Sequence, residues 1–155
     1  MEIKEFLDPS HVMIDVRASD KTRLLRELAG RAAAAIDLPA DAVSSALLKR
    51  EQLGSTGTGG GVAIPHARLD GMSKPFGMLA RLAKAIDFES IDSQPVDIVF
   101  LLLLPAKSQG EQLNALACAA RALRNPDVIG DLHRAVDNTG LYRAVASVTS
   151  KSKPA

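Results

Sequence analysis

The sequence predicts an α/β fold, a three-layer sandwich in which a mixed sheet lies between helices. Short apolar or β-branched runs alternate along the chain with segments whose apolar residues recur at helical spacing. One run, residues 96–104, is apolar on both faces, as in a central strand covered by helices on each side. With 155 residues and no internal repeat or linker, the chain is expected to form one domain over residues 1–150, followed by a polar tail at residues 151–155.

The first third of the chain predicts one strand and two helices. The strand covers residues 11–16, and Asp20 then caps a helix of about four turns. Pro39 separates this helix from a second one, which begins near Ala40 and ends at Gly54. The first helix is amphipathic, with an apolar stripe made of Leu24, Leu25, Leu28, Ala32 and Ile36.

The middle third predicts strands. Residues 62–64 form a short buried strand, and Pro65 ends regular pairing because proline has no amide proton to donate. A mostly apolar stretch at residues 76–83 follows Lys74 and Pro75, a longer strand is expected at residues 96–104, and residues 85–94 are typical of a short edge segment and turn.

The last third predicts helices. A long one begins at Gln109, a short one covers residues 128–132 after the break at Asn125 and Pro126, and Asn138 caps a last one.

Composition excludes several classes of function. A formal net charge of +1 and 3% aromatic residues suit neither phosphate-backbone binding nor base stacking, so no nucleic acid is expected. The longest apolar run, residues 98–104, is too short to span a bilayer, and the N-terminus is not a secretory signal. Together with the single cysteine, Cys118, these features indicate a cytoplasmic protein with no membrane insertion. His11 and His133 lack a metal-ligand context, so neither a metal nor a cofactor is expected.

Glycine is concentrated in one short segment, since five of the eleven glycines lie within residues 54–61. A nucleotide-binding P-loop requires a lysine followed by Ser or Thr, and neither follows the last glycines here. The dinucleotide fingerprint also fails, because its third glycine position falls on Val62 or Ile64. A permissive loop remains, whose backbone amides can approach an anion and which leads through Pro65 to His66.

These residue types suit a phosphohistidine site. Neutral imidazole is a nucleophile near pH 7, and Arg50 provides a positive charge that stabilises a moving phosphoryl group. Ser55 and Thr56 add hydroxyl groups to the loop. The alternative hypothesis is that His66 is a turn histidine in a permissive loop, and residue types alone leave that alternative open.

A longer match then favours the first hypothesis. The string LLKREQLGSTGTGGGVAIPHARL closely resembles the active-site signature of the type-2 enzyme IIA family of the bacterial phosphotransferase system, the mannitol/fructose class. The resemblance covers nearly the whole chain and is strongest to the nitrogen-regulatory enzymes IIA. It implies a mixed sheet of about five strands between helices.

The resemblance also implies roles for individual residues. His66 is the phosphoacceptor, forming a tele-phosphohistidine, and a histidine-containing phosphocarrier protein of the nitrogen system is the donor. Arg50, Ser55 and Thr56 match phosphate-stabilising positions. Many members have a second histidine where this chain has Gln112, whose amide can donate a hydrogen bond to phosphate but cannot become cationic.

Three functions are weighed. The first is a phosphohistidine carrier and regulator whose phosphorylation state is sensed by cytoplasmic proteins such as kinases or potassium-transport components. The second is an enzyme IIA of a fructose/mannitol-type import system that passes phosphate to a IIB domain. The third, from another class, is a non-covalent anion-binding module. A homodimer is left open.

Overall fold

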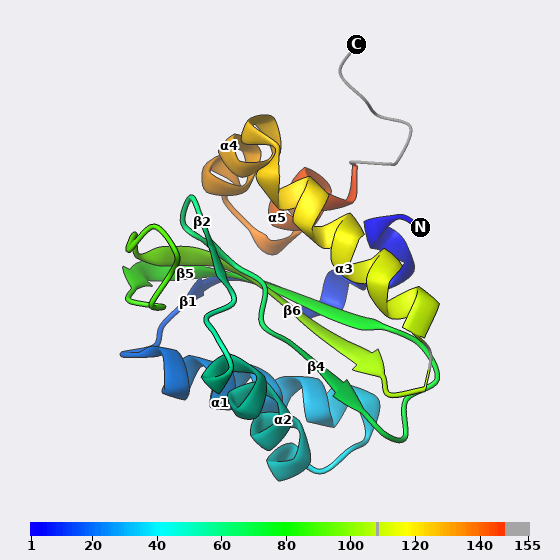
Figure 1. Ribbon diagram of the computed structural model, residues 1–155. Coiled ribbons are helices and arrows are strands. Elements are labelled where there is room, and N and C mark those ends of the chain that lie inside the picture. The colour runs from blue at the N-terminus through cyan, green and yellow to red at the C-terminus, as the bar shows by residue number, and fades with distance from the viewer. Residues whose placement is uncertain (108, 148–155) are drawn as a thin grey trace.

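A computed structural model of the protein describes residues 1–107 and 109–147, without the side chains of residues 109 and 111–113. A mixed sheet lies between two layers of helices, with α1 and α2 on one face and α3, α4 and α5 on the other (Figure 1). The predicted α/β sandwich is therefore confirmed. The elements in chain order are η1 (Ile3–Glu5), η2 (Pro9–His11), β1 (Val12–Val16), α1 (Lys21–Ile36), α2 (Ala40–Gln52), β2 (Gly57–Gly59), β3 (Val62–Ala63), β4 (His66–Leu69), β5 (Phe76–Ile86), β6 (Val96–Pro105), α3 (Gln109–Arg124), α4 (Pro126–Arg134) and α5 (Asn138–Ala146).

The sheet has the strand order β1-β5-β6-β3-β2, and β4 also pairs with β6. β1 runs parallel to β5, β5 runs antiparallel to β6, and both β3 and β4 run parallel to β6. β2 and β3 form a small antiparallel hairpin. The glycine-rich segment, expected to be a flexible loop, is therefore partly built into the sheet.

The central strand β6 is buried on both faces, as its continuous apolar run predicts. Alternate side chains enter two separate cores. Ile98, Phe100, Leu102 and Leu104 pack in the core beneath α3, α4 and α5. Val99, Leu101 and Leu103 pack in the core formed with α1 and α2.

Pairing along the edge of β6 continues beyond Pro65, contrary to the expectation that it ends there. Val62 and Ala63 pair with Ile98 and Val99, and the chain then pairs again from His66, opposite Leu102. The carbonyl oxygen of Pro65 accepts a hydrogen bond from the Leu102 amide (2.9 Å), because proline lacks only the donor of the peptide unit. In the described residues the sheet has six strands, and the short segments on either side of Pro65 account for two of them.

The segment between β5 and β6 is a loop and not an edge strand. β5 extends to Ile86, and residues 87–95, here called the 87–95 loop, contain no strand. Phe88 is fully buried in the core under α1 and α2, so the loop is anchored to the domain at that point. The predicted edge segment is therefore absent, whereas the predicted turn is present, since the Ser93 amide donates to the Ser90 carbonyl oxygen (3.0 Å).

The helix boundaries agree closely with the sequence. The side chain of Asp20 accepts a hydrogen bond from the Arg23 amide (2.8 Å), which confirms the predicted cap of α1. α2 begins at Ala40 and ends two residues before Gly54.

Cys118 is 7% exposed, as expected of a small hydrophobic residue in α3. None of the helices described here is long and apolar enough to cross a membrane. The polar tail expected at residues 151–155 lies outside the described residues.

Candidate active site

His66 is the first residue of β4, and its half-buried ring opens into a cavity of about 610 Å³. The cavity lies at the C-terminal end of α2, which packs beside β4 (Figure 1). Lys49, Arg50 and Arg68 line it with positive charge, and Leu53, Leu104 and Leu116 are among its apolar lining residues. The site thus has the charge and the opening that an incoming phosphoryl group requires.

The ring of His66 is held in one orientation by the backbone. Its Nδ1 lies 2.9 Å from the carbonyl oxygen of Ile64. A carbonyl oxygen can only accept a hydrogen bond, so Nδ1 carries the proton in the neutral ring. Nε2 is therefore the nitrogen with the lone pair, and it is the nucleophilic atom.

The surroundings keep His66 neutral. Burial lowers the pKa of His66 below its usual range. The hydrogen bond to Ile64 acts in the opposite direction, and the charge of Arg50 lowers the pKa further. The net direction is downward, so the ring stays in its nucleophilic form at a pH where many histidines begin to protonate.

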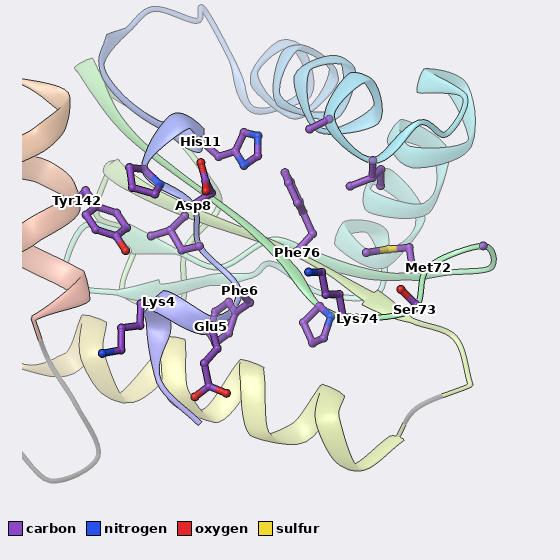
Figure 2. Close-up of a pocket in the computed structure, with 16 residues that line it drawn as sticks. Lys4, Glu5, Phe6, Asp8, His11, Met72, Ser73, Lys74, Phe76 and Tyr142 are labelled. Atoms are coloured by element: carbon purple, nitrogen blue, oxygen red, sulfur yellow. The ribbon is translucent and has the colours of Figure 1, made fainter.

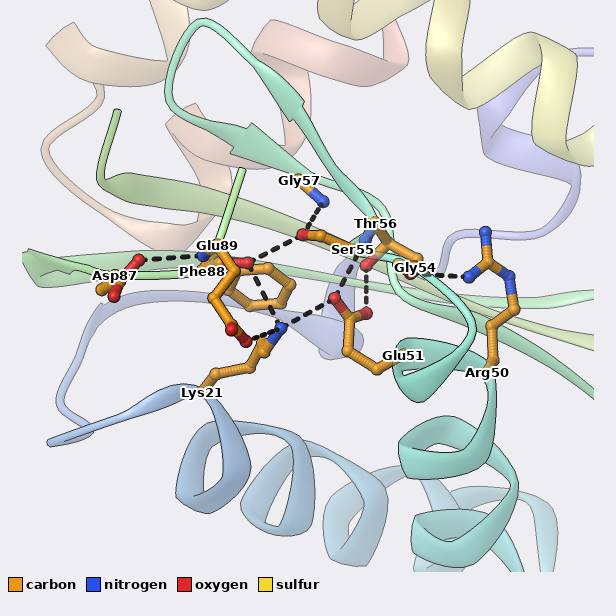
Figure 3. Close-up of polar contacts among 10 residues, drawn as sticks. All are labelled: Lys21, Arg50, Glu51, Gly54, Ser55, Thr56, Gly57, Asp87, Phe88 and Glu89. Atoms are coloured by element: carbon orange, nitrogen blue, oxygen red, sulfur yellow. Dashed lines mark hydrogen bonds and ion pairs between the residues drawn. The ribbon is translucent and has the colours of Figure 1, made fainter. Parts of the chain in front are cut away.

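Arg50 is placed beside this ring by the end of α2. Its Nη1 donates a hydrogen bond to the carbonyl oxygen of Gly54 (2.8 Å), which bends the chain back over the last turn of the helix (Figure 3). The structure thus brings together the two residues, His66 and Arg50, on which the prediction of a phosphohistidine site rests.

Arg68 is a site residue that the sequence reasoning missed. It follows His66 by two positions in β4, so both side chains lie on the same face of the strand. Arg68 lines the same cavity and lowers the pKa of His66 through its charge. The two-residue spacing of His66 and Arg68 in the sequence would indicate a shared face only if residues 66–69 were predicted to form a strand.

Ser55 and Thr56 are not among the residues that line the cavity, and their hydroxyl groups hydrogen-bond to neighbouring protein groups that hold the loop (Figure 3). The Ser55 hydroxyl donates to the carbonyl oxygen of Phe88 (2.7 Å) and accepts from the Gly57 amide (3.0 Å). The Thr56 hydroxyl donates to the carboxylate of Glu51 (2.6 Å). Contact of these hydroxyls with phosphate remains a prediction, and the present geometry uses them to hold the loop.

The loop amides are also engaged within the protein. The Thr56 amide donates to Glu51 (2.9 Å), and the Gly60 amide donates to the carboxylate of Asp92 (2.9 Å). The expectation that amides of this segment cradle an anion is therefore not met at these positions. Gln112 lies in α3, and its side chain is outside the described residues.

A second cavity, of about 570 Å³, lies away from His66 between the N-terminal segment and residues 71–76 (Figure 2). His11 lines it, but its ring packs against Phe76 with the ring centroids 4.8 Å apart. The carboxylate of Asp8 is engaged by the Ser10 amide (2.9 Å). Lys4 and Lys74 also line this cavity, but its histidine packs against an aromatic ring, whereas the ring of His66 is held by a backbone carbonyl beside Arg50.

The other titratable side chains that the structure describes are not grouped as metal ligands. His133 Nε2 lies 3.0 Å from the carboxylate of Asp97, at the surface of α4. Within residues 1–107 and 109–147, no group of three or more His, Cys, Asp or Glu side chains could hold a metal ion.

Comparisons with known proteins point to one family. The model of the phosphoenolpyruvate-dependent sugar phosphotransferase system, EIIA 2, matches residues 5–148. A nitrogen regulatory protein from Bradyrhizobium diazoefficiens is 42% identical over 146 residues, covering 94% of this chain and 95% of that protein. A fructose-specific EIIA component from Haloferax volcanii is 38% identical over 108 residues, which is 70% of each chain. The crystal structure of the nitrogen regulatory protein IIA-Ntr from Neisseria meningitidis superposes with a TM-score of 0.87 at 31% identity, covering 92% of this chain and 98% of that one.

Proposed function

Because the chain belongs to the EIIA 2 family of the phosphoenolpyruvate-dependent sugar phosphotransferase system, we propose that it carries a phosphoryl group on His66 and acts as a regulator of the nitrogen branch of that system. Enzymes IIA of this system take phosphate from phosphocarrier proteins and pass it to partners. The donor proposed for this chain is a histidine-containing phosphocarrier protein, and the regulated partners are cytoplasmic proteins such as kinases or potassium-transport components.

The observation that carries the proposal is the hydrogen bond between His66 Nδ1 and the Ile64 carbonyl. It leaves the lone pair on Nε2, in a ring that lines an open cationic cavity. The product expected from this geometry is the Nε2-linked, or tele, phosphohistidine.

The transfer is a displacement at phosphorus between two imidazoles. The Nε2 lone pair of His66 forms a new P–N bond while the P–N bond of the donor phosphohistidine breaks, and the donor ring leaves with that electron pair. His66 keeps its Nδ1 proton throughout, and the Ile64 carbonyl stabilises the positive charge that develops on the ring. Arg50 and Arg68 stabilise the negative charge of the phosphoryl oxygens.

Phosphorylation changes the surface that a partner meets. A phosphoryl group adds roughly −2 charge at pH 7, whereas the formal net charge of the chain is +1. Leu53 is 85% exposed at the rim of the cavity, so an apolar contact surface and the new charge are adjacent. A partner that docks on the neutral form is expected to be repelled by the phosphorylated form.

A sugar-import role is the second candidate, because the similarity extends to a fructose-specific EIIA component. That role uses the same His66, with onward transfer to a IIB domain. The two are separated by deleting the gene: loss of fructose or mannitol uptake supports import, and unchanged uptake supports regulation.

The central test is transfer of label from phosphoenolpyruvate through the general enzyme and the phosphocarrier to the purified chain. The wild type should gain one acid-labile phosphoryl group, and His66→Ala should gain none. His11→Ala and His133→Ala serve as matched controls and should be labelled like the wild type. Equal labelling of His66→Ala would disprove the proposal, as would reversible anion binding with no covalent product.

A further inference from the structure

Glu51 is a buried acid in the last turn of α2, next in sequence to Arg50. Its side chain is 5% exposed, and both carboxylate oxygens are engaged. Oε1 accepts from the Thr56 hydroxyl (2.6 Å), and Oε2 accepts from the Thr56 amide (2.9 Å) and from Lys21 Nζ (3.1 Å). Burial of a carboxylate is costly unless it is paired in this way, so the arrangement holds Thr56 firmly.

Lys21, the first residue of α1, joins this carboxylate to the 87–95 loop (Figure 3). Its Nζ lies 3.1 Å from Glu51, 2.9 Å from the carboxylate of Glu89 and 3.3 Å from the Phe88 carbonyl oxygen. Burial by itself would lower the pKa of Lys21, but the hydrogen bonds to the two carboxylates outweigh it and raise the pKa. Lys21 therefore stays charged across the physiological pH range.

A continuous series of hydrogen bonds leads from this cluster to the imidazole. Thr56, held by Glu51, accepts the Ile64 amide on its carbonyl oxygen (3.0 Å). The carbonyl oxygen of Ile64 in turn accepts the Nδ1 proton of His66 (2.9 Å). The Ile64 carbonyl, which orients His66, is thus held in place through Thr56, and Thr56 is anchored by Glu51.

From this connection we propose that Glu51, held in place by Lys21, is a positioning residue for phosphoryl transfer to His66. It acts through Thr56 and the Ile64 carbonyl, and it keeps the ring in the tautomer whose lone pair is on Nε2. The inference rests on the proposed function at His66 for its kinetic consequence, whereas the tautomer can be measured in the unphosphorylated protein.

The first measurement is the pair of ring ¹⁵N chemical shifts of His66. The wild type should show a protonated Nδ1 and an unprotonated Nε2. Glu51→Gln should shift the ring toward a mixture of tautomers, because Gln supplies only one acceptor where Glu51 uses two. It should also lower the pKa of His66, since the negative charge of Glu51 raises that pKa.

The second measurement is the rate of phosphoryl transfer at saturating phosphocarrier. Glu51→Gln should lower this rate roughly 10- to 100-fold, as expected when a nucleophile loses its alignment, with little change in KM for the donor. Glu27→Gln is the matched control, because Glu27 pairs with Arg31 on the surface of α1 and its loss should leave both rate and tautomer unchanged.

A second set of variants avoids dependence on one substitution. Thr56→Val removes the hydroxyl donor to Glu51 and should reproduce the tautomer shift, while Thr56→Ser should restore the wild-type values. A wild-type tautomer and transfer rate in folded Glu51→Gln or Thr56→Val would overturn the inference. If the wild type is never phosphorylated but Glu51→Gln still loses the Nδ1-protonated tautomer, the proposed function is overturned and the role of Glu51 in positioning the ring is supported.

Discussion

His66 donates its Nδ1 proton to the carbonyl oxygen of Ile64, the residue on the far side of Pro65. The bond reaches back only two positions, and Pro65 restricts the backbone between its two ends. The ring is therefore oriented directly by a backbone carbonyl at the far end of a short, stiff segment, and the proposed role of Glu51 is to hold that carbonyl in place. This explains how a histidine at the rim of an open cavity can keep a defined tautomer.

The pH dependence of phosphoryl acceptance should reflect the lowered pKa of His66. The neutral ring is the nucleophile, so the rate falls as the pH drops through the pKa, and this acid limb should lie below the range of an ordinary histidine. Titration of the ring by NMR and the pH profile of the transfer rate should give the same midpoint. An acid limb above pH 7 in both measurements would contradict the proposed environment.

The same shift affects stability. The folded protein holds fewer protons on His66 than the unfolded chain in the window between the two pKa values. The contribution of His66 to the free energy of unfolding is therefore fully present above the pKa of the unfolded chain. It is lost as the pH falls through the lower pKa of the folded protein. Urea unfolding of wild type and His66→Gln across this window should show the difference.

Replacement of Arg50 tests the cation beside the ring. Arg50→Gln removes the charge proposed to stabilise the phosphoryl group and the guanidinium donor to the Gly54 carbonyl. We expect transfer to slow on the order of 100-fold, comparable to the loss of one transition-state donor, and we expect the pKa of His66 to rise because Arg50 lowers it. Transfer assays and ring titration provide the two readouts.

Arg26→Gln is the control for that change, since Arg26 is exposed on α1. Arg50→Lys should fall between the wild type and Arg50→Gln, because lysine keeps the charge but not the planar donor geometry. Equal rates for Arg50→Gln and Arg26→Gln would show that Arg50 has no part in transfer.

Much of the fold follows from local patterns in the sequence. The apolar run of β6, which is buried on both faces, and the Asp20 cap of α1 are both determined by neighbouring residues. Both lie where the sequence predicts them. The association of His66 with Arg50 was predicted from a motif, and the structure supplies the cavity in which they meet.

The remainder depends on contacts between distant residues, which no local pattern reveals. The direction of the Ser55 hydroxyl is set by the carbonyl of Phe88, 33 positions away. Nothing in the residues near Glu51 indicates that it pairs with Lys21, which lies 30 positions away in the sequence. Strand β4 is not evident from local patterns because a proline suggests the end of pairing, whereas Pro65 lacks only the amide proton and its carbonyl oxygen still accepts from Leu102.

Gln112 is expected to tune phosphoryl transfer, because the family resemblance implies a second histidine at this position in many members. Gln112→His would introduce a side chain that can become cationic and move a proton, which an amide cannot. We expect transfer to become roughly 100-fold faster, at the low end of what general acid–base groups contribute, and the phosphorylated form to have a different lifetime. Rapid-quench assays measure the first and decay of the isolated phosphoprotein the second.

Gln112→Asn is the matched control, because it keeps the amide and shortens the side chain by one carbon. An unchanged rate and lifetime in Gln112→His would show that this position does not influence the phosphoryl group.

The contact between Gly57 and Ser90 should limit substitution in the glycine-rich hairpin. A Cβ added at Gly57 would lie 2.3 Å from the Ser90 hydroxyl oxygen and 3.0 Å from the Ser90 Cβ, so the hairpin and the 87–95 loop would have to separate. Gly57→Ala should therefore lower the free energy of unfolding by about 1–3 kcal/mol, the usual cost of overpacking. Because the Gly57 amide also donates to Ser55 next to Thr56, the variant should slow phosphoryl transfer as well. Adding Ser90→Gly to Gly57→Ala removes both of the closest atoms, so the double variant should regain most of the lost free energy of unfolding.

Gly60→Ala serves as a contrast. Its added Cβ meets nothing within 4 Å, so its cost comes from a left-handed backbone with φ of +68°. Urea unfolding of the wild type, Gly57→Ala, the double variant and Gly60→Ala separates steric repulsion from backbone strain. If Ser90→Gly fails to rescue Gly57→Ala, steric contact with Ser90 is not what requires glycine at this position.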